Sequence, residues 1–128
     1  DHDLQLPTAQ MDPAREFCGQ RFVRHVSADA KWNESEFVGF LSRDTGIRAA
    51  TNGLADVRVL RALLDSSFQV TNTGNEELIF YFVLAGTASV HLDESGRELG
   101  AGDSVVSPKG TALSCAAAAG CEMLYVRL

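Results

Sequence analysis

Short apolar segments recur about every eight to twelve residues along the second half of this chain, and turn residues separate them. Asp56 to Leu64 is rich in Val and Leu, and Thr87 to Leu92 alternates apolar with polar side chains. Leu78 to Leu84 is a continuous apolar run, so both of its faces are expected to be covered. Asn72 to Asn75 and Gly100 to Asp103 supply turn residues. This pattern predicts an all-β chain folded as an antiparallel sandwich or barrel.

The length of 128 residues fits one domain, and the composition is that of a globular protein, 45% hydrophobic and 22% charged. The net charge is -6 and no basic stripe is visible, so we expect no nucleic acid and no membrane surface as a partner. No apolar run approaches the roughly 18 residues of a membrane span. We divide the chain into an N-terminal arm, residues 1–20, and a β-barrel domain, residues 21–128.

The three cysteines, Cys18, Cys115 and Cys121, are odd in number and contain no C-x-x-C pair. This pattern favours buried free thiols in a reducing cytoplasm over a disulfide framework, and we therefore expect a cytoplasmic protein. The alternative is that Cys115 and Cys121 face each other across a hairpin. Zinc is not expected, because scattered cysteines and three histidines do not supply four ligands.

Gly102, Pro108 and Gly110 have the spacing of the glycines and proline in the second motif of the cupin superfamily, which this segment resembles. The motif continues with a His and an Asn, whose positions here are Leu113 and Ala117. The resemblance covers residues 55–128 and implies a double-stranded β-helix, the cupin jelly roll. It places the chain among small, single-domain, RmlC-like bacterial cupins, which are commonly homodimers. Phe37, Phe40 or Trp32 would supply the apolar contact of such a dimer.

The first cupin motif is anchored on Gly86, which puts its Glu at Ile79 and its two His at Asn72 and Gly74. In cupin enzymes these positions, with the His of the second motif at Leu113, hold iron, manganese or another divalent ion. The chain thus keeps the residues that turn the backbone and lacks those that bind metal. We therefore expect no metal and no other cofactor.

Other chemical groups give weaker candidates. Glu77 and Asn72 would make an oxygen-rich site, but a solvated Glu77 at the entrance of a strand is the favoured interpretation. His91 lies on the face of its segment opposite to the apolar residues, so it should point away from the interior. No nucleophile motif and no phosphate loop is present, so no catalytic residue is assigned.

The remaining candidate site is the barrel interior. Ile79, Tyr81 and Leu113 should make it apolar. The Tyr81 hydroxyl, the Asn72 amide and the Arg61 guanidinium would be its polar groups, with Arg61 on the face of the neighbouring valines. An apolar cavity with a few convergent polar groups is typical of a small-molecule site, although an interior filled by its own side chains would have the same sequence.

The sequence therefore predicts a metal-independent cupin that binds a small, largely apolar organic ligand, either as a sensor or as a degenerate enzyme. A second hypothesis is a cupin dioxygenase, isomerase or cyclase with its site relocated to Glu77, Asn72 and Tyr81. A third is a structural or accessory dimer whose barrel is packed and closed.

Overall fold

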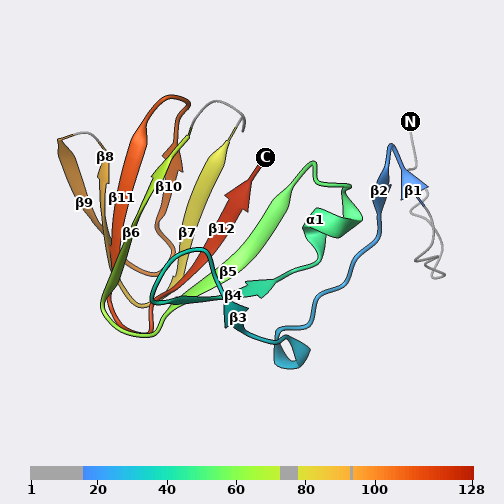
Figure 1. Cartoon of the computed structure of the whole chain (residues 1–128), viewed down its shortest axis with the longest axis horizontal. Helices are drawn as coiled ribbons and strands as arrows, with labels where there is room; N and C mark the ends of the chain where they lie inside the picture. The colour runs from blue at the N-terminus through green and yellow to red at the C-terminus, as the bar shows by residue number, and fades with distance from the viewer. Residues whose placement is uncertain (1–15, 73–77, 93) are drawn as a thin grey trace, which may run out of the picture.

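The computed structural model describes residues 16–72, 78–92 and 94–128, and their strands form two stacked antiparallel sheets (Figure 1). The larger sheet contains, in spatial order, β10 (Ser104–Ser107), β7 (Ile79–Ala85), β12 (Glu122–Arg127), β5 (Asp56–Ala62), β4 (Phe40–Asp44) and β3 (Asn33–Glu34). The smaller sheet contains β6 (Ser66–Thr71), β11 (Ala112–Ala117), β8 (Ala88–Leu92) and β9 (Ser95–Leu99). The predicted all-β jelly roll is confirmed.

A short N-terminal hairpin precedes the two sheets. It consists of β1 (Glu16–Phe17) and β2 (Gln20–Arg21), and the 3-10 turn η1 (Ser27–Asp29) follows it. The hairpin is attached beside the helical turn α1 (Ile47–Ala50), where the Arg21 guanidinium donates to the Ala49 carbonyl at 2.9 Å. The Asn52 amide donates in addition to the Gly19 carbonyl at 2.7 Å. Residues 1–15 of the predicted arm lie outside the described residues, and the described chain joins the larger sheet at β3.

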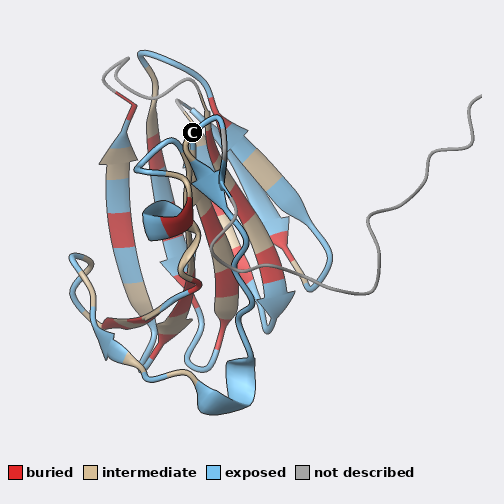
Figure 2. Ribbon diagram, turned by 90° about the vertical axis from the view of Figure 1, so that its right-hand side faces the viewer, coloured by how far each residue is buried: buried red, intermediate tan, exposed pale blue. Residues whose placement is uncertain are grey.

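Alternation along the strands decides which side chains enter the core, and Figure 2 shows buried residues alternating with less buried ones. In β7, Ile79, Tyr81 and Val83 are buried between the sheets. Phe80 and Phe82 point to the opposite face and are only partly buried. The continuous apolar run is therefore not covered on both faces, contrary to the expectation from its sequence.

Gly86, the anchor of the first motif, has a φ of +81°, a value that favours glycine. A Cβ atom built there would lie 2.9 Å from the Cα of Cys121, so the strand that returns leaves no room for a side chain. This turn follows β7 directly and brings β8 into the smaller sheet.

The three cysteines are free, with Cys18 exposed and Cys115 and Cys121 buried. Burial raises the pKa of the Cys115 thiol to about 12 and also raises the pKa of the Cys121 thiol. The Cys115 Sγ lies 3.9 Å from the Sδ of Met123 within the core. Among the described residues, no helix has the length and apolar character that crossing a membrane requires.

The aromatic residues expected to form a dimer contact have other roles. Phe40 is 3% exposed, and Phe37 packs against the core. The Trp32 ring lies 5.0 Å from the guanidinium carbon of Arg43 and 4.1 Å from that of Arg61. Phe40 is therefore too buried to form a dimer contact, whereas Trp32 and Phe37 are partly exposed and already contact other side chains of the chain.

Candidate functional site

Four of the five predicted ligand-contacting residues face the interior between the sheets. Ile79 and Tyr81 lie on β7 and Leu113 lies on β11, and all three belong to the hydrophobic core. Asn72 follows the end of β6 and is also fully buried. The structure thus brings these residues together as packed walls of the barrel.

The fifth predicted residue, Arg61, lies on the outer face of β5. Leu60 belongs to the core, so the alternation of β5 places Arg58 on the inner face and Arg61 on the outer face. Arg61 donates to Glu122, its register partner on β12, through Nε at 2.8 Å. A molecule inside the barrel would therefore meet Arg58, which the sequence analysis missed, and not Arg61. Apolar residues share the face of each arginine along β5, so no local sequence signal distinguishes Arg58 from Arg61.

Five rings form an aromatic cluster inside the barrel: Phe37, Phe40, Phe68, Tyr81 and Tyr125. The Phe37 ring is stacked on Phe68 with centroids 4.4 Å apart and meets Tyr125 edge-on at 5.8 Å. Tyr81 packs against Tyr125 at 5.1 Å and against Phe68 at 5.9 Å. Phe37 comes from the loop before β4, so this loop contributes the outermost ring of the cluster.

Two hydroxyls inside the barrel lack hydrogen-bond partners among the described residues, namely Tyr81 Oη and Ser107 Oγ. Both side chains are fully buried. Burial, and then the neighbouring Tyr125, raise the pKa of Tyr81 far above its usual range. Burial likewise raises the pKa of Tyr125 to about 12. Leaving a buried hydroxyl without a partner costs about 1–3 kcal/mol.

One end of the barrel opens into a polar hollow of about 370 Å³, which we call the barrel mouth. Its lining residues come from three strands (β4, β5 and β12), from α1 and from the loop before β4: Glu36, Asp44, Arg48, Asp56, Arg58 and Arg127. Arg127 is the register partner of both Asp56 and Ile79. The mouth therefore lies at the same end of the barrel as the first-motif position Ile79.

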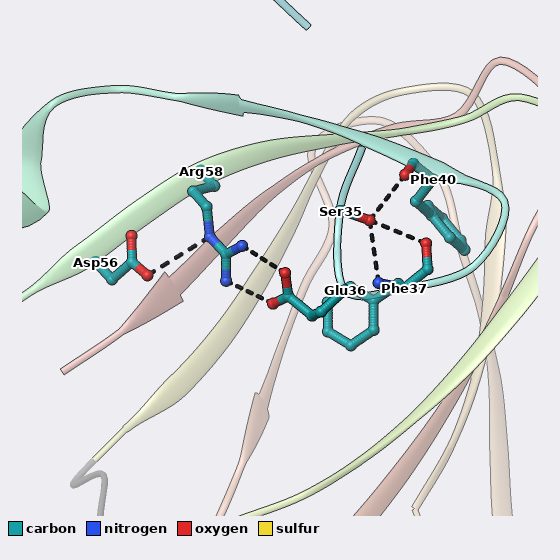
Figure 3. Close-up of polar contacts among 6 residues, drawn as sticks. All are labelled: Ser35, Glu36, Phe37, Phe40, Asp56 and Arg58. Carbon is teal, nitrogen blue, oxygen red and sulfur yellow. Dashed lines mark hydrogen bonds and ion pairs between the residues drawn. The ribbon is translucent and has the colours of Figure 1, made fainter. Parts of the chain in front are cut away.

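Arg58 is the centre of the barrel mouth (Figure 3). Its Nη1 and Nη2 donate to the two carboxylate oxygens of Glu36, each at 2.7 Å, and its Nε lies 3.5 Å from Asp56 Oδ2. Its guanidinium carbon lies 5.2 Å from the centre of the Tyr125 ring. The hydrogen bonds to Arg58 lower the pKa of Glu36, and the same contact raises the pKa of Arg58.

Residues 35–39 form the mouth loop, which carries both Glu36 and Phe37. Ser35 organises this loop, because its hydroxyl accepts from the Phe37 amide at 3.1 Å and lies 2.8 Å from the Phe40 carbonyl (Figure 3). Gly39 has a φ of +87°, and a Cβ there would overlap Ser66. The loop is thus fixed at its two ends by backbone contacts, whereas Val38 at its tip is 91% exposed.

A second hollow, of about 400 Å³, lies where β6 begins and β11 ends. It is lined by Asp65, Ser66, Ser67, Ala116, Ala117 and Ala118. Its lining residues include no cation and no aromatic ring, so the barrel mouth is the chemically richer of the two hollows.

Comparison with solved structures gives clear matches over most of the chain. KdgF from Halomonas sp. has a TM-score of 0.68 at 15% identity, covering 80% of this chain and 91% of its own. An RmlC-like cupin from Shewanella frigidimarina NCIMB 400 has a TM-score of 0.68 at 14% identity, covering 85% of this chain and 92% of its own. Pac13 from Streptomyces, a nucleoside dehydratase, has a TM-score of 0.61 at 15% identity, covering 81% and 79% respectively. The chain has the cupin fold. No protein-family model and no curated protein matches it.

The residues present at the cupin metal positions do not fit a divalent ion. Asn72 is buried and its amide donates to the Ser107 carbonyl at 3.3 Å, while Ile79 and Leu113 offer no donor atom. Gly74 and the alternative ligand Glu77 lie outside the described residues. Among the described residues, no group of three or more His, Cys, Asp or Glu is placed to hold a metal. Such ions need several imidazole or carboxylate ligands, which these positions do not supply.

His91 is exposed on β8 and its ring lies against Gly96 of β9, where a Cβ would be 2.8 Å from its Nε2. It faces away from the interior, as its place in the alternating segment predicted. It therefore takes no part in the candidate site.

Proposed function

We propose that this cupin-fold protein binds a small, largely apolar organic molecule in its barrel without a metal ion. The observation that carries this proposal is the pair of fully buried hydroxyls without partners, Tyr81 Oη and Ser107 Oγ. Buried polar groups in proteins are nearly always hydrogen-bonded, so these two hydroxyls offer hydrogen bonds that a bound molecule would use. A ligand with an apolar body and a hydrogen-bonding group would satisfy one of them.

The barrel mouth supports the proposal, because its volume of about 370 Å³ lies in the range of small-molecule sites. The aromatic cluster lies directly beneath Arg58 and supplies the apolar surface. A sensor and a degenerate enzyme would both use these features, binding the molecule without a metal-assisted step.

Analysis of the purified protein tests this proposal. Mass spectrometry of untagged protein, purified without additives, should find a retained organic molecule and no stoichiometric metal. Tyr81→Phe should reduce the retained amount, whereas His91→Phe on the outer face of β8 should not. Stoichiometric iron, manganese, nickel or zinc would overturn the metal-independent part of the proposal.

A closed accessory barrel is the second candidate function. The complete burial of Asn72, Ile79, Tyr81 and Leu113 favours it, because these side chains already fill the positions at which a ligand would bind. Under this function no molecule is retained, and Tyr81→Phe changes nothing except stability.

A cupin enzyme with a relocated site is the third candidate function. Its support is that a protein of the same fold, Pac13, is a nucleoside dehydratase, and that Tyr81 faces the interior. Turnover of candidate substrates that disappears in Tyr81→Phe would favour it over the binding function. Of the other two residues assigned to this alternative, Asn72 is fully buried and Glu77 lies outside the described residues.

We also propose that two copies of the chain associate through the outer face of the larger sheet. Apolar side chains of four adjacent strands share this face, which we call the outer apolar face: Val57, Val59, Phe80, Phe82, Leu84, Val106, Leu124 and Val126. Leu84 is 41% exposed and Val106 is 44% exposed. With strands about 4.8 Å apart and about 3.3 Å per residue, the face measures roughly 450 Å². This is about half of what one partner contributes to a standard interface, enough for its apolar centre.

Charge favours a second copy as the occupant of this face. Two identical chains of net charge -6 repel each other unless their contact surface is neutral. On the described strands β10, β7, β12 and β5, the outward-pointing charges are Arg61 and Glu122, which neutralise each other.

Light scattering should give a dimer for the wild type and for His91→Lys, and a monomer for Val106→Lys. A monomeric wild-type protein would overturn the proposal.

A further inference from the structure

The mouth loop places two chemically different groups into the candidate site from adjacent residues. Glu36 puts a carboxylate on the fork of Arg58, with two hydrogen bonds of 2.7 Å. Phe37 puts an aromatic ring against Phe68 and Tyr125. The loop thus occupies the site with a carboxylate and an aryl ring held side by side (Figure 3).

Both groups are side chains of a loop whose backbone is held at its two ends, so only the side chains need to turn out of the site. Glu36 remains 46% exposed although it is paired, and Phe37 is only partly buried. The neighbouring strand β4 has its own partners on both sides, β3 and β5. Arg58, in contrast, is 17% exposed and belongs to the interior of the larger sheet. The receiving arginine is therefore on a central strand of the sheet, whereas the occupying groups are on a loop.

We propose that this site takes small aryl carboxylates, in which a short chain joins an aromatic ring to a carboxylate, and that these replace the side chains of Glu36 and Phe37. The inference rests on the proposed function and names its ligand class. The carboxylate of the ligand takes the two guanidinium hydrogen bonds of Arg58, an arrangement for which the planar fork is suited. Its ring stacks on Phe68 and Tyr125 in place of the Phe37 ring.

The exchange conserves the interactions of Arg58 and of the aromatic rings. The two hydrogen bonds to Arg58 are lost by Glu36 and regained by the ligand, and the released Glu36 carboxylate returns to water. The ring of the ligand likewise replaces the Phe37 ring on Phe68 and Tyr125. The loop side chains act as a tethered competitor, which reduces the apparent affinity by the fraction of time that they occupy the site. Weakening the competitor should therefore strengthen binding.

Titration calorimetry with 3-phenylpropanoate on the full chain tests this prediction. Glu36→Gln should bind the probe about tenfold more tightly than the wild type, because a neutral amide competes poorly for Arg58. Phe37→Ala should also bind more tightly. Arg58→Lys keeps the charge but loses the fork, and should bind about tenfold more weakly. 2-Phenylethylamine, which replaces the carboxylate by a cation, should not bind to any of these proteins.

The second arginine–glutamate pair of β5 provides the matched controls. Glu122→Gln and Arg61→Lys change the same side chains on the outer face, and both should leave the affinity for the probe unchanged. Equal affinities of Glu36→Gln and Glu122→Gln would overturn the inference, as would undiminished binding by Arg58→Lys. Circular dichroism of each variant confirms that it is folded before its affinity is compared.

The proposed ligand binding in the barrel can be correct even if the inferred ligand class is wrong. If the purified protein retains an uncharged molecule and Glu36→Gln does not bind 3-phenylpropanoate, the ligand class is wrong and ligand binding in the barrel stands. If nothing is retained and the probe does not bind either, both proposals are wrong.

Discussion

Two arginines of β5 make the same set of contacts on opposite faces of one sheet. Arg58 pairs with Glu36 and lies over the ring of Tyr125, on the inner face. Three residues later, Arg61 pairs with Glu122 and lies over the ring of Trp32, on the outer face. Each site thus combines a guanidinium, a carboxylate and an aromatic ring, with Asp56 in addition on the inner face and Arg43 in addition on the outer face.

The difference lies in how the acidic partner is held. Glu122 is the register partner of Arg61 on the adjacent strand, so the sheet itself keeps the outer pair together. Glu36 comes from a loop 22 residues before Arg58, and no strand pairing fixes it. Strand pairing supports the outer pair, whereas the inner pair depends on a loop, and for this reason we propose that a ligand replaces Glu36. Side-chain identity alone therefore does not distinguish a binding site from a surface ion pair.

The largest expected difference between the two sites concerns their rings. Tyr125→Ala should lower the free energy of unfolding by about 3–5 kcal/mol, because it removes a fully buried ring from the core. Trp32→Ala should cost only about 1 kcal/mol, since that ring is partly exposed and lies over two arginines. Urea unfolding of both variants measures the difference. Similar losses would mean that the two sites are equally structural.

The arginines themselves should differ by a smaller amount. Arg58→Met should lower the free energy of unfolding by about 1–2 kcal/mol, because a mostly buried guanidinium and both of its hydrogen bonds are lost. Arg61→Met should cost less than about 1 kcal/mol, the usual value for a pair open to solvent. The same urea titrations provide the measurement, and a larger loss for Arg61→Met would reverse the comparison.

The pH dependence of stability should distinguish the two glutamates further. The pKa of Glu36 is lowered by Arg58, so its ionised form stabilises the folded chain above the pKa of the unfolded state. That contribution is lost as the pH falls through the lowered pKa. The difference in unfolding free energy between the wild type and Glu36→Gln should therefore be below about 1 kcal/mol at pH 6 and shrink toward pH 3. A difference that grows on acidification would contradict this assignment.

The smallest expected effect on the free energy of unfolding is that of removing the Tyr81 hydroxyl. Tyr81→Phe removes an oxygen that has no partner among the described residues, so stability should be unchanged or rise by up to about 1 kcal/mol. Thermal unfolding of ligand-free protein measures it. A loss of more than about 1 kcal/mol would show that the hydroxyl already has a partner and would weaken the case for an occupant.

Local sequence signals were sufficient to predict the fold and most of the residues of the interior. Gly102, Pro108 and Gly110 carried the resemblance to cupins, and the structural neighbours confirm that fold. The anchor at Gly86 placed Ile79 correctly on an inner face, because alternation along one strand is a local property.

The polar part of the site, Arg58 and Glu36, could not be predicted from local sequence, because it depends on contacts between distant segments. Along β5 both faces carry apolar residues, Val59 on one and Leu60 on the other, so the sequence does not show which arginine points inward. Pairing with β4 and β12 decides this. Glu36 had no local signal at all, since its partner is brought to it only when the barrel forms.

The cysteines give the barrel a built-in reporter of its opening. Cys18 is exposed, whereas Cys115 and Cys121 lie within the walls and their thiols resist ionisation. A thiol reagent should label the first immediately and the other two only at the rate at which the sheets separate. Occupancy of the interior would therefore be readable as slower alkylation of two native sulfur atoms, without attaching any foreign label.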